Sequence, residues 1–362
     1  FSLIMQNNQA IPFNKENFKQ ILSKEFALVI IVSIPSAMIA EYLDVPLAWF
    51  LGPMIITSIV TLCGIKTRMP KLVLSATLII LGLYIGNYID KNLFSQIHQW
   101  LWTSLIMLGY IIVSVLLVSR YLEKFSGYDK KTSIFSAAPG ALGPLMILAE
   151  DEKSDLSRVA TSHLIRLIII ITVFPFIVNS FYNVEDIETV KLSLNDQNSF
   201  DLLILIFISI AFILLFDRLR IPAALLSGTL VASGVLQITD LAAYKLPPNI
   251  IDYSLLILGS SVGCRFADKT FNEIGKNALH SFVATFLLVM LGLLAAFIAS
   301  LIIDKNFFTL LLSYCPGGIY EVAVIAIFFD LDPEFVSFHH IIRLLMILFI
   351  VPLILKVIGK KR

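Results

Sequence analysis

The sequence predicts an all-α polytopic membrane protein built from two inverted repeats of about six segments each. In each repeat, five segments are expected to cross the bilayer, and one Pro-Gly segment is expected to be broken or re-entrant. Three observations lead to this prediction: an apolar composition, a series of apolar stretches separated by short polar ones, and an internal register between the two halves of the chain.

The composition is that of a membrane protein. Hydrophobic residues make up 58% of the chain and charged residues 15%, with a mean hydropathy of +0.88, whereas a soluble domain is about 45–50% apolar and about 25% charged. The net charge of +1 and the lack of a basic block give no reason to expect a nucleic-acid partner. Cys63, Cys264 and Cys315 have no metal-binding or disulfide spacing, so they are expected to be packing residues, and no cofactor or metal is expected.

Twelve apolar segments fall six and six on either side of a polar stretch. Many are about 20 residues long, enough to span a hydrocarbon layer about 30 Å thick. They lie at about 25–42, 46–63, 70–89, 98–119, 132–149, 157–182, 200–216, 222–239, 250–266, 280–303, 307–329 and 336–356.

The expected organisation follows from these segments. It comprises a cytoplasmic N-terminal segment (1–24), membrane repeat 1 (25–182), an extracytoplasmic linker (183–199), membrane repeat 2 (200–358) and a basic tail (359–362). The chain begins with Phe1 rather than Met, so we expect a trimmed N-terminus. Residues 1–24 are too polar to be a signal peptide.

The second half repeats the first at a shift of 176–177 residues. Matches between uncommon residue types hold this register over about 130 positions, which makes a duplicated unit the expected origin of the chain. The matched pairs are Pro46 and Pro222, Gly52 and Gly228, Gly82 and Gly259, Gly86 and Gly263, Ser136 and Ser313, Pro139 and Pro316, Gly140 and Gly317, Asp155 and Asp332, His163 and His340, Arg166 and Arg343, and Pro175 and Pro352. Within the chain, Gly82 with Gly86 and Gly259 with Gly263 form two GxxxG steps that predict close helix packing.

Loop charges favour an inverted arrangement, because cytoplasmic loops are enriched in Lys and Arg. If all twelve segments cross, 17 of the 27 Lys and Arg lie on the N-terminal side and 8 on the other. If the Pro-Gly segments enter and return on one side, 21 lie inside, 4 lie outside, and Arg166 and Arg343 remain within the membrane. We therefore expect both termini in the cytoplasm. Whether the Pro-Gly segments re-enter or cross as broken helices stays open.

The Pro-Gly segments are the leading candidates for a binding site. Irregular backbone at membrane depth is tolerated only where it lines protein or a water-filled cavity, and paired broken helices in inverted repeats are typical of secondary transporters. Half-helix ends with unpaired N–H groups suit an anionic group. The candidate residues are Ser136, Pro139 and Gly140 in the first segment, and Ser313, Pro316, Gly317 and Gly318 in the second. The alternative is a pair of plain kinks closed by neighbouring helices.

Glu321 follows the second break by five residues. An acid within a membrane segment is a functional-site hypothesis by default, and this one suits coupling to H⁺ or Na⁺. The alternative is an interfacial carboxylate that caps the second half-helix. The first repeat has Pro144 at the equivalent position, so any ion role differs between the halves.

Two His-Arg pairs, His163 with Arg166 and His340 with Arg343, share helix faces because their members are three residues apart. Arg offers a bidentate fork to a carboxylate or phosphate. The two pairs are therefore predicted to form an anion clamp or to partner Glu321. The alternative places both arginines near the membrane surface, where they snorkel to headgroups or bind loop carbonyls.

These motifs together resemble the bacterial AbrB family of membrane proteins, which is distinct from the DNA-binding regulator of that name. The resemblance covers about residues 25–356 and is carried by "LAWFLGP" (47–53), "AAPGALGPL" (137–145) with "HLIR" (163–166), and "CPGGIYEV" (315–322) with "HIIR" (340–343). It implies an inner-membrane protein suspected of transporting small organic compounds. Family breaks usually read PGG followed by an acid, and Ala141 and Pro144 depart from this pattern in the first repeat.

The expected function is secondary transport of a small organic anion, with a shikimate-like hydroxy acid compatible, coupled to H⁺ or Na⁺. The partners expected are the solute and the lipid bilayer; the sequence leaves the oligomeric state open. A membrane sensor or regulator that affects gene expression without transport is the alternative. An enzyme is not expected, because the chain has no evident nucleophile–base or metal-binding set.

Overall fold

The computed structural model describes residues 15–89, 93–140, 142–181, 199–239, 241, 247–267 and 269–359. These residues form fifteen helices and none of them lies in a β-strand, which confirms the all-α class. The expected linker lies outside the described residues apart from Ser199, as does the C-terminal tail apart from Gly359.

The first helix lies in the N-terminal segment, and each repeat contains seven of the other helices. In order they are α1 (Lys15–Ile21), α2 (Lys24–Tyr42), α3 (Ala48–Leu62), α4 (Lys71–Gly86), α5 (Leu93–Phe125), α6 (Lys130–Ala137), α7 (Leu142–Asp151) and α8 (Leu156–Phe181), followed by α9 (Ser199–Arg218), α10 (Ala224–Thr239), α11 (Pro248–Cys264), α12 (Phe271–Ser300), α13 (Phe307–Tyr314), α14 (Ile319–Phe328) and α15 (Pro333–Gly359).

Five helices are long and apolar enough to cross a membrane, namely α2, α5 from Gln99, α8, α12 from Ala278, and α15 to Val357. Large apolar side chains on these helices are exposed, including Ile31 (67% exposed), Phe286 (53% exposed) and Phe349 (71% exposed). Large exposed apolar surfaces are uncommon in soluble proteins. The protein is therefore a multi-pass membrane protein whose outer apolar surface is solvated by lipid.

Each Pro-Gly segment breaks in the same backbone conformation. Ala138 (φ −60°, ψ 127°) and Cys315 (φ −58°, ψ 130°) are both extended and both precede a proline. Proline crowds the residue before it and disfavours the helical region there, so α6 ends at Ala137 and α13 ends at Tyr314. The shared geometry shows that the duplicated sequence makes duplicated local structure.

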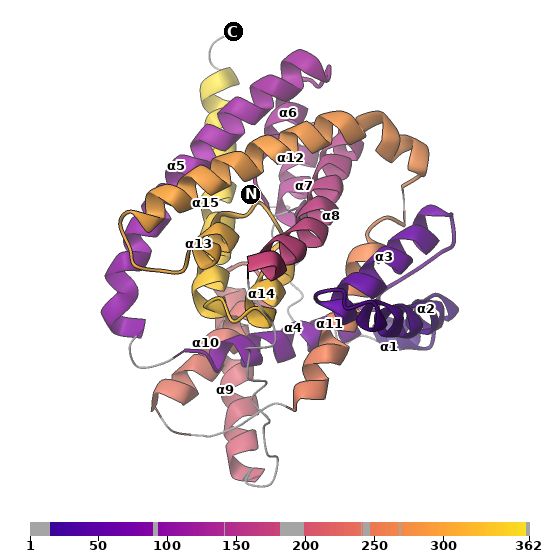
Figure 1. Cartoon of the computed structure of the whole chain (residues 1–362), viewed down its shortest axis with the longest axis vertical. Helices are drawn as coiled ribbons and strands as arrows, with labels where there is room; N and C mark the ends of the chain where they lie inside the picture. The colour runs from indigo at the N-terminus through magenta and orange to yellow at the C-terminus, as the bar shows by residue number, and fades with distance from the viewer. Residues whose placement is uncertain are drawn as a thin grey trace.

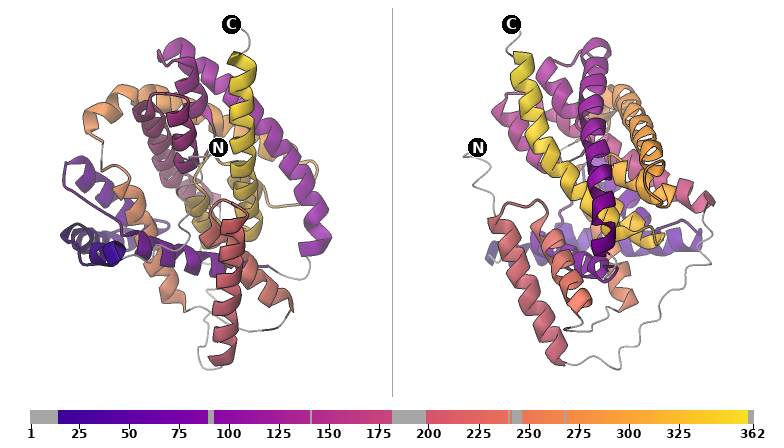
Figure 2. Two further views of the ribbon diagram at one scale, coloured as in Figure 1. Left: turned by 180° about the vertical axis from the view of Figure 1, so that it is seen from behind. Right: turned by 90° about the vertical axis from the view of Figure 1, so that its left-hand side faces the viewer.

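The helices form two groups, which lie in different parts of the molecule in all three views (Figures 1 and 2). The scaffold group contains α2–α4 and α9–α11, with α3 packed on α11 and α4 packed on α10. The hairpin group contains α5–α8 and α12–α15, in which α5 packs on α6, α12 packs on α13, and α5 and α12 contact each other. Contacts between the groups are sparse and run mainly from α4 to α14 and α15. Each group thus combines equivalent helices from both repeats.

Four glycines let helices of opposite repeats approach closely in the scaffold group. Gly82 and Gly86 of α4 lie against α10, where an added Cβ would overlap the Leu226 and Leu230 carbonyls. Gly259 and Gly263 of α11 lie against α3 in the same way. The two GxxxG steps thus make equivalent contacts, in agreement with the close packing expected of small residues at membrane-helix interfaces.

We expect Gly259→Ala to lower the apparent unfolding temperature of the purified protein in detergent. A Cβ at this position would overlap the Phe50 carbonyl oxygen, and overpacking of this kind costs about 1–3 kcal/mol. The matched control is Gly109→Ala on α5, where no atom lies within 4 Å of the added Cβ. Equal unfolding temperatures for the two variants would contradict the packing described here.

Candidate functional site

Helices α6 and α7 form a hairpin whose tip is the first Pro-Gly break. Lys131 at the start of α6 forms an ion pair with Glu152, just after α7 (Nζ to Oε2, 2.6 Å). The chain therefore returns, after the break, to the level at which α6 began. Helices α13 and α14 do the same, because Lys305 before α13 pairs with Asp332 after α14 (Nζ to Oδ1, 3.1 Å).

Arg166 of α8 holds the tip of the first hairpin. Its Nη1 donates to the carbonyl of Ala138 (2.6 Å) and its Nη2 donates to the carbonyl of Ser136. His163, one turn earlier on α8, lies with Nε2 3.0 Å from the carbonyl of Phe135, and since a carbonyl only accepts, Nε2 is the donor. The last carbonyls of a helix have no intrahelical partner, so these side chains supply the missing donors.

Arg343 of α15 also holds the tip of the second hairpin through two carbonyls, of which the Cys315 carbonyl is the counterpart of the Ala138 carbonyl. Its Nη1 donates to the carbonyl of Cys315 and its Nη2 donates to the carbonyl of Gly317 (2.5 Å). Nη2 also lies 3.2 Å from Nδ1 of His340, whose Nε2 is 3.0 Å from the carbonyl of Leu312. Arg343 can only donate, so Nδ1 accepts from it, and the Leu312 carbonyl can only accept, so Nε2 donates to it. His340 is therefore the neutral tautomer with its proton on Nε2.

This arrangement changes the role expected of the two arginines. Both side chains are buried at 2% exposure, so they do not reach out to lipid headgroups, and the NH groups described above bind hairpin carbonyls rather than Glu321. The structure shows that the two arginines bind carbonyls. The sequence analysis expected this only in the alternative in which both arginines lie near the membrane surface. The positive charge of each guanidinium nevertheless stays beside a hairpin tip.

The two tips lie next to each other. An added Cβ on Gly140, in the first tip, would lie 2.8 Å from Nη2 of Arg343, which holds the second tip. An added Cβ on Gly317 would lie 3.3 Å from Ile170 of α8, the helix that holds the first tip. Gly140 also has φ of +120°, a conformation that favours glycine. Glycine at these positions therefore permits each tip to contact the helix that clamps the other.

The serines before the breaks are not equivalent in the structure. Ser313 Oγ donates to the carbonyl of Thr309 (2.8 Å), within its own helix. Ser136 Oγ is buried and has no hydrogen-bond partner among the described residues, and the same is true of Nε of Arg166. Buried polar atoms without a partner are uncommon. Pro139 and Pro316 lie within the tips themselves, where they end α6 and α13 without contributing a donor.

Glu321 lies at the second tip, in the first turn of α14, and is 1% exposed. Its Oε1 lies 2.9 Å from Nη2 of Arg265. The carboxylate also lies over Gly318, where any Cβ would overlap Oε2. The sequence proposed Arg166 or Arg343 as the partner of Glu321, but the structure gives it Arg265, which follows α11 in the scaffold group. This carboxylate is buried within the protein.

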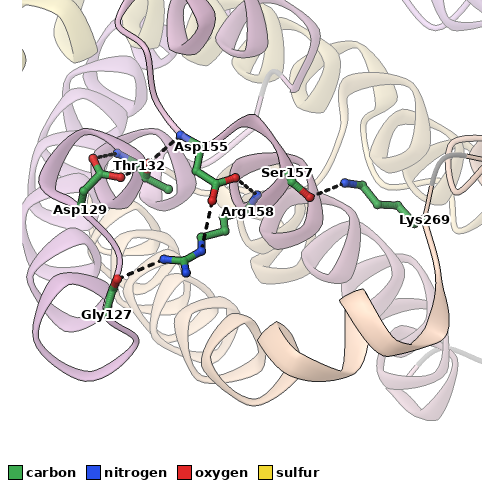
Figure 3. Close-up of polar contacts among 7 residues, drawn as sticks. All are labelled: Gly127, Asp129, Thr132, Asp155, Ser157, Arg158 and Lys269. Atoms are coloured by element: carbon green, nitrogen blue, oxygen red, sulfur yellow. Dashed lines mark hydrogen bonds and ion pairs between the residues drawn. The ribbon is translucent and has the colours of Figure 1, made fainter.

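The base of the first hairpin is fixed by a polar cluster (Figure 3). Asp129 caps α6, accepting from the backbone N–H groups of Lys131 (3.0 Å) and Thr132 (3.1 Å). The backbone N–H of Asp155 donates to Thr132 Oγ1 (2.9 Å), which joins the start of α8 to the start of α6. Arg158 pairs with Asp155 (3.3 Å). In the second hairpin, Thr309 Oγ1 donates to Asp332 Oδ2 (3.3 Å), between the equivalent positions.

A cation–π contact is present at both hairpin bases with its partners exchanged. The Arg158 guanidinium carbon lies 5.0 Å from the centroid of the Tyr128 ring, and Lys305 Nζ lies 5.5 Å from the centroid of the Phe335 ring. A shift of 177 residues places Tyr128 on Lys305 and Arg158 on Phe335. The cation and the ring have therefore changed places while the contact, worth about 0.5–1 kcal/mol at exposed sites, is present in both repeats.

The region around the two hairpin tips carries positive charge. Three guanidinium groups lie at the tips, those of Arg166, Arg343 and Arg265. Glu321, which lies beside Arg265, has the only buried carboxylate among the residues whose burial is described. The N-termini of α7 and α14 also begin at the tips, and each adds roughly half a positive charge. The C-termini of α6 and α13 contribute the opposite partial charge, which the arginines neutralise. The remaining field favours an anion.

Sequence reasoning singled out the residues of the tips but missed Arg265 as part of the site. Arg265 follows α11, the helix equivalent to α4, and its counterpart in the first repeat is Tyr88 at the shift of 177 residues, so the repeat register gave no matching arginine. The available signal was the asymmetry itself. Glu321 and Arg265 are opposite charges at two positions where the first repeat carries neither.

Comparison with known proteins identifies similar membrane proteins. A model of the family described as "Transition state regulatory protein AbrB" matches residues 1–86 and 49–359, so residues 49–86 fall in both matches, as a duplicated chain allows. A Bacillus subtilis (strain 168) protein named "Uncharacterized protein YhjN" is 22% identical over 351 residues, covering 89% of this chain and 90% of its own length. An Escherichia coli (strain K12) protein named "Putative regulator AbrB" is 23% identical over 320 residues, covering 87% and 90%. No solved structure matches the chain.

We expect Arg343→Lys to open the second hairpin tip although it keeps the positive charge. A Lys ammonium lacks the planar fork that reaches two carbonyls at once, and an unpaired buried acceptor costs about 1–3 kcal/mol. Cys315 is buried in this tip, so its maleimide labelling in a Cys63→Ser, Cys264→Ser background reports opening. The rate should rise about tenfold.

The control for this prediction is Arg218→Lys, at an exposed position at the end of α9. It should leave the labelling of Cys315 unchanged. If Cys315 in Arg343→Lys reacted as slowly as in the wild type, positive charge alone would explain Arg343, and the carbonyl clamp would not be needed.

Proposed function

The chain belongs to the AbrB family of membrane proteins, and we propose that it is a secondary transporter of a small organic anion. The observation that carries this proposal is the pair of helical hairpins with adjacent tips. In the proposed topology the repeats are inverted, both termini are cytoplasmic, and the protein resides in the bacterial inner membrane. The hairpins then enter from opposite faces and their tips lie near the midplane.

Paired breaks at the midplane of inverted repeats are the usual position of substrate and ion sites in secondary transporters. The loop charges support the same topology, because it places 21 Lys and Arg inside and 4 outside. It also gives the irregular backbone of each tip a place inside protein rather than in lipid, where its unpaired groups would be costly.

The division into a scaffold group and a hairpin group supports a moving part. Alternating access in transporters is largely a rigid-body movement of one bundle against another around a fixed site. Here the hairpin group contains both tips and both clamping helices, α8 and α15, and it contacts the scaffold group mainly through α4. We propose that the hairpin group moves as a unit, carrying the solute site past the scaffold group.

The charge at the tips supports an anionic solute. Buried guanidinium groups that lack a carboxylate are costly in a low-dielectric interior unless another negative group compensates them. Carbonyl oxygens satisfy the hydrogen bonds of Arg166 and Arg343 but bring no net negative charge. An organic anion bound between the tips would supply that charge. A shikimate-like hydroxy acid fits, since its hydroxyl groups would find partners in groups such as Ser136 Oγ.

Glu321 is proposed to couple solute movement to a cation. It is a buried acid at the second tip with no counterpart in the first, and neutralisation by H⁺ or ligation of Na⁺ would change its pairing with Arg265. We propose no enzymatic activity. A sensor that binds the same anion without moving it is the alternative. It is favoured by the word "regulatory" in the description of the matched family and the word "regulator" in the name of the Escherichia coli relative.

The proposal predicts that proteoliposomes containing the wild-type protein accumulate at least one member of an organic-acid panel, with an inward H⁺ or Na⁺ gradient as the driving force. Glu321→Gln should lose gradient-driven accumulation yet retain exchange across the membrane, because the coupling group is gone while the solute site remains. Glu150→Gln, on the exposed face of α7, is the matched control and should accumulate solute as the wild type does.

Three outcomes are informative. Accumulation that survives in Glu321→Gln contradicts the coupling role. Binding of a panel member without any uptake favours the sensor alternative. If no member of the panel binds and none is taken up, the support for an organic-anion transporter is lost.

A further inference from the structure

The ion pair between Arg265 and Glu321 joins the two helix groups. Arg265 follows α11 in the scaffold group, and Glu321 lies in α14 in the hairpin group. The ion pairs Lys131–Glu152, Arg158–Asp155 and Lys305–Asp332 instead lie within the hairpin group. The Arg265–Glu321 pair thus crosses the boundary along which the proposed movement takes place, and it lies beside a hairpin tip.

We propose that Arg265 is the residue that binds the carboxylate of the transported anion, and that Glu321 takes the place of that carboxylate when the site is empty. This inference rests on the proposed function, because the anion in question is the transported solute. It assigns a solute contact to the scaffold group, whereas the sequence placed all candidate contacts on the hairpins and their clamping helices.

Availability distinguishes Arg265 from the other two central arginines. Arg166 and Arg343 each donate through both terminal nitrogens to carbonyls that fix a tip, so binding of a solute there would cost those bonds. Arg265 pairs instead with a side chain that can rotate away. Its own side chain is 30% exposed, whereas Arg166 and Arg343 are 2% exposed. A guanidinium released by Glu321 would therefore be free to bind a carboxylate.

The geometry around Glu321 fits a temporary partner. Its Oε1 lies 2.9 Å from Arg265 Nη2, yet this oxygen has no well-oriented hydrogen bond among the described residues. Arg and carboxylate form their strongest pairs through two parallel hydrogen bonds, whereas Oε1, the oxygen close to Arg265, accepts none from the described residues. Gly318 leaves the space that the carboxylate occupies. A solute carboxylate able to meet the guanidinium with both oxygens would form the better pair.

The position of Arg265 also indicates the side from which the solute would reach it. Lys269, in the connection from α11 to α12, donates to Ser157 Oγ at the start of α8 (2.9 Å; Figure 3). The end of α11 therefore lies on the side where the first hairpin has its base. In the proposed topology this is the cytoplasmic side. A solute carboxylate bound by Arg265 would then lie between the scaffold group and the second hairpin tip, in the place that Glu321 leaves.

Peptide-resolved labelling of arginine by phenylglyoxal tests the inference without a known solute. In the full-length protein in detergent, Glu321→Gln should raise the labelling of Arg265 about fivefold or more, because the internal competitor is gone. Labelling of Arg343 should stay low in both proteins. Unchanged labelling of Arg265 in Glu321→Gln would overturn the inference.

Ligand binding gives a second readout, with shikimate and succinate as carboxylate probes and methyl shikimate as the uncharged control. A competitor that occupies the site raises the apparent Kd by the inverse of the fraction of molecules whose site is free. The carboxylate that protects Arg265 from labelling should therefore bind Glu321→Gln, which has no such competitor, about tenfold more tightly than the wild type. It should bind Arg265→Gln at least tenfold more weakly. Arg218→Gln is the control for loss of an exposed charge. Wild-type affinity in Arg265→Gln, or loss of carboxylate binding in Glu321→Gln, would overturn the inference.

The inference and the proposed function can fail separately. If the wild type takes up a carboxylate and Arg265→Gln does so with an unchanged KM, the transporter proposal stands and the role of Arg265 is refuted. If carboxylates protect Arg265 but no solute enters proteoliposomes, Arg265 is an anion-binding residue of a sensor, and the transporter proposal is refuted.

Discussion

The carbonyl groups at the two hairpin tips set the main constraint on this structure. A helix that ends inside a membrane protein leaves carbonyls that neither lipid nor its own turn can satisfy. Arg166 and Arg343 meet that need with a forked group that reaches two carbonyls at once. The hairpins depend on these bonds for their shape. The same bonds bring two positive charges to the place where the tips meet, so a structural requirement also makes the site anion-selective in the proposed function.

Duplication has preserved the supports of the hairpins and altered what lies at the tips. The arginine and histidine clamps, the contacts between Thr and Asp at each base, and even a cation–π contact with exchanged partners recur in both repeats. Glu321 has Pro144 as its counterpart, and Ser136 and Ser313 bond differently. Both hairpins must fold, which explains why the contacts that support them are the same in the two repeats. A site that binds one solute needs no such symmetry, which allows the residues at the tips to differ.

The sequence was sufficient for much of the fold and for only part of the site. Composition and segment length predicted the all-helical membrane class, and Pro139 and Pro316 marked the two breaks, because proline acts locally. Whether each broken segment crosses or returns depends on contacts such as Lys131 with Glu152, which local patterns do not encode. The spacing of His163 and Arg166 placed them on one face but did not show what that face meets. The partner of Glu321 is 56 residues earlier in the chain and in another helix group, so no local spacing could reveal it.

In the proposed topology the two hairpins enter the membrane from opposite faces, and single cysteines at their bases test this arrangement most directly. Asp151→Cys at the end of α7 and Asp304→Cys before α13 both lie at exposed positions, and each would be introduced in a chain whose three cysteines are replaced by serine. A membrane-impermeant maleimide applied to intact spheroplasts should label Asp304→Cys at once and Asp151→Cys only after permeabilisation. Labelling of both positions from the same face would contradict the inverted arrangement and the midplane site that depends on it.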